Sequence, residues 1–126
     1  MKILNVVAPC VCLLSFAGCA ADSTDMGSVT ISTYSLHVAR EGDGAVAGAM
    51  PRFVIKPTSG GNPTSIKAWV GLEAIDATGK FLAAYDSADG DFDADVTVPT
   101  PLPTGAQLWL DVETTGTTTT GSIALK

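Results

Sequence analysis

The stretch FDADVTVPTPLPTGAQLWLDV, residues 92–112, holds the pattern that decides the fold. Apolar and polar residues alternate on both sides of a proline-rich turn at residues 99–105. The apolar members are Phe92, Ala94, Val96, Val98, Ala106, Leu108, Leu110 and Val112. Because successive side chains of a strand point to opposite faces of a sheet, this alternation predicts two strands that each bury one face. Proline and glycine between them predict a loop.

Further short runs of the same type lie outward from this stretch. Residues 52–56, 81–85 and 122–125 predict strands. Residues 29–38 predict one long strand, with a change of phase near Thr33 that we interpret as a bulge. Short strands separated by Gly and Pro turns at this spacing are typical of immunoglobulin-like domains. The sequence therefore predicts an all-β fold, an immunoglobulin-like β-sandwich of about seven short antiparallel strands.

One segment, SIKAWVGLEAIDA at residues 65–77, is compatible with two structures. As a helix it would be capped by Ser65. As a strand it would bury one face, formed by Ile66, Ala68, Val70 and Leu72. Gly71 lies in the middle of the segment and would destabilise a helix by about 1 kcal/mol, so we favour the strand.

Composition narrows the classes of function. The chain has 126 residues, 13 Asp and Glu, 7 Lys and Arg, and a formal net charge of −6. This length suits one domain. Acidic surfaces without clustered basic residues do not attract phosphates, so nucleic acid is not expected as a partner. A single histidine and the lack of a Gly-x-Ser-x-Gly motif argue against an enzyme.

The N-terminal residues have the pattern of a secretory leader. Lys2 supplies a positive charge, residues 6–16 form a short apolar run, and small residues follow at 17–21. The apolar run is shorter than the ~20 residues that a membrane-spanning helix needs, and Pro9 interrupts it. We expect this segment to direct export and then to be removed.

The residues Phe16-Ala17-Gly18-Cys19 resemble the lipobox of bacterial lipoproteins, although Phe16 occupies a position that is usually aliphatic. The resemblance implies cleavage before Cys19 and a diacylglycerol on its sulfur. It also implies attachment to the outer membrane, because Ala20 is not the aspartate associated with retention at the inner membrane. The alternative is cleavage after Ala20 or Ala21, which would release a soluble secreted or periplasmic domain.

These features predict three parts of the chain. Residues 1–18 form a signal peptide that is removed, residues 19–28 contain the lipidated cysteine and a short polar tether, and residues 29–126 form a single β-sandwich domain. Cys10 and Cys12 fall in the removed part, so Cys19 is the only cysteine left after cleavage. The domain is therefore expected to fold without disulfides.

Five aspartates are concentrated in residues 86–95. Carboxylate oxygens are the ligands that Ca²⁺ prefers, so Asp89, Asp91 and Asp93 are a candidate calcium site, with Asp86 as a further ligand. The segment lacks the ligand spacing of an EF-hand. The alternative is structural, because charged side chains keep an edge strand soluble and block pairing with other chains.

Two tryptophans are out of phase with the apolar face of their strands. Trp69 alternates with Lys67 and Glu73, and Trp109 with Asp111. Outward-facing aromatic rings form binding surfaces, so Trp69 and Trp109 are candidates for a platform that contacts a glycan or a partner protein. The alternative is that one tryptophan occupies the core of the sandwich.

His37 is the last candidate. It could bind copper or zinc only with help from Met26, Met50 or nearby carboxylates, and a surface histidine is the simpler interpretation.

The main hypothesis is a lipid-anchored binding or accessory module of the bacterial envelope that presents a sheet face to a protein or polysaccharide. The alternatives are a calcium-binding β-domain and a small secreted metallochaperone.

Overall fold

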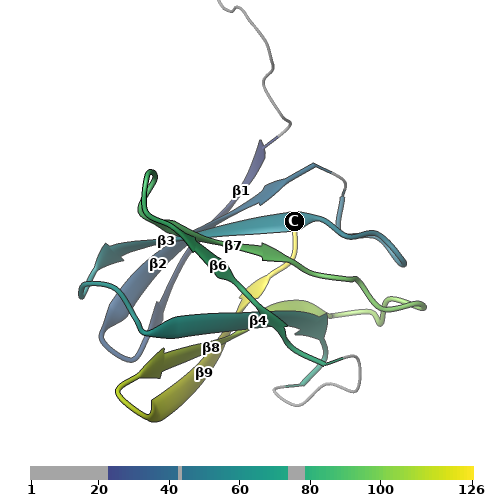
Figure 1. Ribbon diagram of the computed structural model, residues 1–126. Coiled ribbons are helices and arrows are strands. Elements are labelled where there is room, and N and C mark those ends of the chain that lie inside the picture. The colour runs from purple at the N-terminus through teal and green to yellow at the C-terminus, as the bar shows by residue number, and fades with distance from the viewer. Residues whose placement is uncertain (1–22, 43, 74–78) are drawn as a thin grey trace, which may run out of the picture.

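The computed structural model describes residues 23–42, 44–73 and 79–126, and these form an all-β protein of two antiparallel sheets (Figure 1). The strands are β1 (Ser23–Ile31), β2 (Tyr34–Glu41), β3 (Arg52–Ser59), β4 (Ser65–Gly71), β5 (Phe81–Leu82), β6 (Ala84–Asp86), β7 (Asp91–Asp95), β8 (Gln107–Thr114) and β9 (Thr117–Ala124). In this part of the chain there is no helix that could span a membrane.

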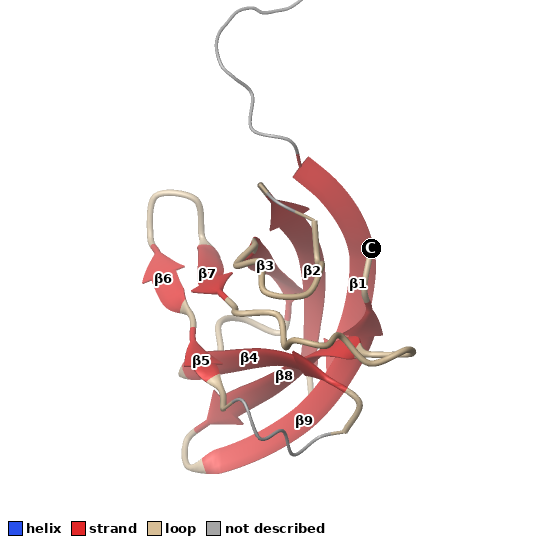
Figure 2. Ribbon diagram, turned by 90° about the vertical axis from the view of Figure 1, so that its right-hand side faces the viewer, coloured by secondary structure: helices blue, strands red, loops and turns tan. Residues whose placement is uncertain are grey.

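The strands are distributed over a five-stranded and a four-stranded sheet. The first has the order β1-β2-β3-β7-β6, and the second has the order β5-β4-β8-β9. The chain passes between the sheets after β3, between β5 and β6, and after β7, so both sheets are built from distant parts of the sequence (Figure 2). Every pairing is antiparallel.

The core lies between the two sheets and follows the predicted alternation. The buried apolar residues include Leu36, Val38, Phe53, Ile55, Ile66, Ala68, Val70, Phe92, Ala94, Val96, Val98, Leu108, Leu110 and Val112. Full burial of one large apolar side chain stabilises a fold by about 1.5–3 kcal/mol. The two alternating runs on either side of the proline-rich turn therefore supply inward faces to both sheets, through β7 and β8.

The N-terminal region differs from the sequence prediction in two ways. Residues 29–38 form parts of two strands, because Ser32 and Thr33 make a tight turn with a positive φ of 58° at Ser32. The change of phase thus marks a hairpin, and the bulge lies earlier, between Asp25 and Gly27. Residues 23–28, predicted as tether, form most of β1 and pair with β2.

The segment predicted as either strand or helix is a strand over Ser65–Gly71, as favoured. Ile66, Ala68 and Val70 are buried, but Leu72 lies past the strand end and is 54% exposed, so its predicted burial is wrong. The end of the segment, residues 74–78, lies outside the described residues.

Residues 81–85, predicted as one strand, are divided between the sheets. Phe81–Leu82 pairs with β4 and Ala84–Asp86 pairs with β7. Ala83 between them is buried, and its N–H donates to the Ile66 carbonyl oxygen at 2.9 Å. A small side chain at this position lets the chain pass from one sheet to the other at the edge of the core.

Candidate cation-binding site

The acidic residues are gathered by the hairpin between β6 and β7. Asp86 and Asp91 are directly opposite each other in the ladder, and a four-residue turn joins them. The Gly90 N–H donates to the Asp86 carbonyl oxygen at 2.8 Å, and Gly90 has a φ of 70°. The Asp86 Oδ1 also accepts a hydrogen bond from the Ala88 N–H at 2.9 Å. These bonds fold the turn back on itself and bring its carboxylates together.

Three carboxylates form a compact group at this turn. One oxygen from each of Asp86, Asp89 and Asp91 lies within 4.8 Å of the others. The group contains Asp89 and Asp91 of the predicted set and Asp86, the predicted further ligand, whereas Asp93 is outside it. The turn places Asp86 directly opposite Asp91, so Asp86 joins the group across the ladder.

Asp91 is the unusual member of the group. Its residue is only 8% exposed, and its buried Oδ1 has no hydrogen-bond partner. Burial, the largest cause, and the nearby carboxylates of Asp93, Asp89 and Asp86 together raise the pKa of Asp91 to about 6. An unpartnered buried carboxylate oxygen costs free energy unless a proton or a cation compensates it.

This raised pKa predicts a pH dependence of stability without added cation. The unfolded chain loses the Asp91 proton near pH 4, whereas the folded chain keeps it to about pH 6. The folded state therefore binds more protons between these values, and the free energy of unfolding should fall by about 2 kcal/mol as the pH rises from 4 to 6.5. Urea unfolding at several pH values measures this, and Asp91→Asn should remove the decline. A decline of equal size in that variant would contradict the assignment.

Asp95, in the same strand, has a different environment. Its carboxylate binds the Arg52 guanidinium, with an Nε to Oδ1 distance of 3.0 Å. The hydrogen bond from Arg52 lowers the pKa of Asp95. Its charge is thus already compensated, and Asp95 is a matched control for the three crowded carboxylates.

The two tryptophans lie on the outer face of the four-stranded sheet, as their phase predicts. Trp69 and Trp109 are directly paired across β4 and β8, with ring centroids 6.4 Å apart and an angle of 15° between the rings. Each indole N–H donates to a main-chain oxygen near the end of β4: Trp109 to Gly71, the last residue of the strand, at 3.0 Å, and Trp69 to Glu73, two residues further on, at 3.3 Å.

The predicted exposure of Trp69 is wrong, because its side chain is fully buried. The Lys80 ammonium lies 4.5 Å from the centre of the Trp69 ring and binds Asp111 at 2.7 Å. Trp109 covers another side of the same ring and is itself half-buried. Trp69 thus belongs to a small packed cluster on the outside of the sheet, and it offers no binding platform.

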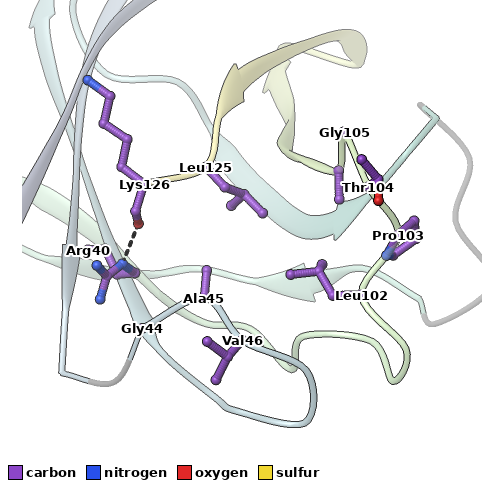
Figure 3. A pocket seen from close by; sticks show the side chains of 11 residues that line it. Arg40, Gly44, Ala45, Val46, Leu102, Pro103, Thr104, Gly105, Leu125 and Lys126 are labelled. Carbon is purple, nitrogen blue, oxygen red and sulfur yellow. Dashed lines mark hydrogen bonds between the residues drawn. The ribbon is translucent and has the colours of Figure 1, made fainter.

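A groove of about 520 Å³ opens at the end of the sandwich where the C-terminus lies (Figure 3). Its wall is mostly apolar and includes Val46, Leu102 and Leu125. Arg40 stands at one end, where its Nε donates to the main-chain oxygen of Lys126 at 2.7 Å. The groove thus offers apolar surface beside a guanidinium that is already engaged.

His37 and Cys19 are the remaining residues that the sequence analysis singled out. The His37 Nε2 lies 2.8 Å from the Asp25 Oδ1 on the surface of the five-stranded sheet, whereas Met26 is buried. Among the described residues, the aspartates of the β6–β7 turn are the only group of three potential metal ligands, and His37 is not in it. Cys19 lies outside the described residues.

The described geometry defines a class: an all-β protein of two antiparallel sheets with three crowded carboxylates at a sheet edge. No protein-family model, curated protein or solved structure matches the chain. The function therefore has to be inferred from the chain's own residues.

Proposed function

We propose that this protein is a lipid-anchored binding module of the bacterial outer membrane whose β6–β7 hairpin binds Ca²⁺ through Asp86, Asp89 and Asp91. The observation that carries the calcium site is Asp91: the residue is only 8% exposed, its buried Oδ1 has no hydrogen-bond partner, and its carboxylate lies beside two others. A divalent cation bound between the three carboxylates offsets two of their three negative charges and supplies the partner that the buried oxygen of Asp91 lacks.

The donor set suits calcium better than the soft transition metals. All three side chains offer oxygen, and Ca²⁺ accepts 6–8 oxygens at 2.3–2.6 Å with flexible geometry. Three carboxylates, each binding through one or both oxygens, supply about half or more of these 6–8 oxygen ligands. Water molecules supply the remaining ligands. Histidine and cysteine, which copper and zinc prefer, are not in the group. A metallochaperone role is therefore the weaker hypothesis.

We also propose that the domain is an immunoglobulin-like β-sandwich. The order β2-β3-β7-β6 facing β5-β4-β8-β9 supports this, because it follows the A-B-E-D and C′-C-F-G orders of that architecture. β1 is then an additional strand outside A. The calcium hairpin corresponds to the connection between strands D and E.

Calcium should stabilise the protein. At neutral pH, 10 mM Ca²⁺ should raise the free energy of unfolding by about 1–3 kcal/mol, assuming a dissociation constant of about 0.1–1 mM, the range of extracellular calcium modules. Thermal melting with and without calcium measures the shift. The shift should shrink below pH 6, because a proton on Asp91 then competes with the cation.

Two substitutions in the same hairpin make this test specific. Asp91→Asn should abolish the calcium-dependent shift, whereas Asp95→Asn should keep it, since Asp95 is paired with Arg52 outside the group. An unchanged melting temperature of the wild-type chain in 10 mM Ca²⁺ would refute the site. So would an equal shift in the Asp91→Asn variant.

The lipid anchor is tested separately in cells. Labelled palmitate should appear on the wild-type chain and in the Cys12→Ser control, and Cys19→Ser should reduce the label to background. The wild-type chain should also have lost residues 1–18, as mass spectrometry would show. Persistent labelling of Cys19→Ser, or an intact leader on the wild-type chain, would disprove the anchor.

A further inference from the structure

Each sheet has two edges, and unpaired strand edges are templates for pairing with other chains. Three of the four edges carry features that discourage such pairing. β5 has two residues and β6 has three, and β1 contains the bulge at Asp25. β9 has eight residues in unbroken register with β8, and it contains no charge, no proline and no bulge.

The register shows which main-chain groups of β9 are unpaired. Thr115 and Gly116 both have positive φ values, 47° and 83°, and form the two-residue turn between β8 and β9. In such a hairpin the residues flanking the turn, Thr114 and Thr117, are a hydrogen-bonded pair, and bonded and non-bonded pairs then alternate. The N–H and C=O groups of Thr118 and Thr120 therefore point away from β8, toward the open edge.

Side-chain exposure shows which half of the open edge of β9 is accessible to another chain. Thr117, Thr118 and Thr120 are exposed, whereas residues 121–123 are half-buried. At Gly121, an added Cβ would lie 2.7 Å from the Ile31 side chain, so β1 packs closely there. The free edge is thus centred on Thr119.

We infer that β9 pairs antiparallel with β9 of a second copy of this chain, with the twofold axis at Thr119. Thr118 of each copy then exchanges two main-chain hydrogen bonds with Thr120 of the other, and the two four-stranded sheets become one of eight strands. The inference does not depend on calcium or on the lipid.

Two observations favour a second copy over another occupant. Threonine is directly opposite threonine along the pairing, and such cross-strand pairs are favourable. Each chain also has a net charge of −6, so two copies approach most easily where neither carries charge. β9 is an uncharged strip of this kind.

Cysteine cross-linking of the full chain tests the axis. In a background with Cys10, Cys12 and Cys19 all changed to Ser, Thr119→Cys supplies the only thiol. Residues facing each other at a non-hydrogen-bonded pair have Cα atoms about 4.5 Å apart, within reach of a disulfide. Mild oxidation should therefore produce covalent dimers in high yield. Thr30→Cys, at the exposed edge of β1, is the matched control and should form no covalent dimer.

A second substitution separates pairing from chance collision. Thr118→Pro removes an N–H that points outward, so it leaves the ladder with β8 intact, and it should reduce the cross-linked fraction at least tenfold. Sedimentation of the chain with native Thr118 and Thr119 at about 100 µM should show a dimer. A monomer there, no cross-link at Thr119→Cys, or an equal yield with Thr118→Pro or Thr30→Cys would overturn the inference.

Discussion

Replacing Trp69 with alanine is expected to lower the free energy of unfolding by about 3–5 kcal/mol, the range for removing a buried large aromatic side chain. The indole is fully buried, stacks on Trp109 and lies beneath the Lys80 ammonium. Truncation removes all of these contacts and leaves a cavity on the outer face of the four-stranded sheet. Urea unfolding followed by circular dichroism measures the loss.

Leu82→Ala is the matched control on the same sheet. Leu82 is 65% exposed in the short strand β5, so its truncation should change the free energy of unfolding by less than about 0.5 kcal/mol. A loss below about 1 kcal/mol for Trp69→Ala would mean that Trp69 is accessible to solvent, and the platform hypothesis would then regain support.

Gly60→Ala should be nearly as damaging, with a loss of about 2–5 kcal/mol. Gly60 follows β3 with a φ of 91°, which costs an L-residue about 1–2 kcal/mol. An added Cβ would also lie 2.3 Å from the Thr33 carbonyl oxygen, and a main-chain atom cannot rotate away. Crowding of this kind adds about 1–3 kcal/mol.

Gly61→Ala separates the two causes. Gly61 has a similar φ of 81°, but nothing lies within 4 Å of the position of its Cβ. Chemical denaturation should show a loss of about 1–2 kcal/mol for this variant, from backbone strain alone. Equal losses for the two variants would show that the loop after β3 does not press against the β1–β2 turn.

The buried faces could be predicted because alternation is a local property of a strand. Phe92, Ala94, Leu108 and Leu110 are all buried, as their spacing indicates. The division of residues 81–85 between two sheets could not be predicted, because both halves have strand character and only tertiary packing decides which neighbour each half meets.

The same limit applies to the site residues. The phase of Trp69 correctly placed the ring on the outer face, but phase carries no information about which other residues, here Lys80, fold over that face. In the acidic segment, spacing along a strand pointed to Asp93, whereas the turn brings Asp86 across to Asp91. A Ser-Ala-Asp-Gly sequence between two aspartates is the signal that could have indicated a tight hairpin.

The early start of β1 has a consequence for any anchored form of the protein. Only three residues separate Cys19 from Ser23, the first residue of β1, and four steps of extended chain cover at most about 14 Å. With so short a tether, an anchored domain stays next to the membrane surface. It meets only what lies at the lipid surface or is brought there, and its neighbours in the plane of the membrane become its most frequent encounters.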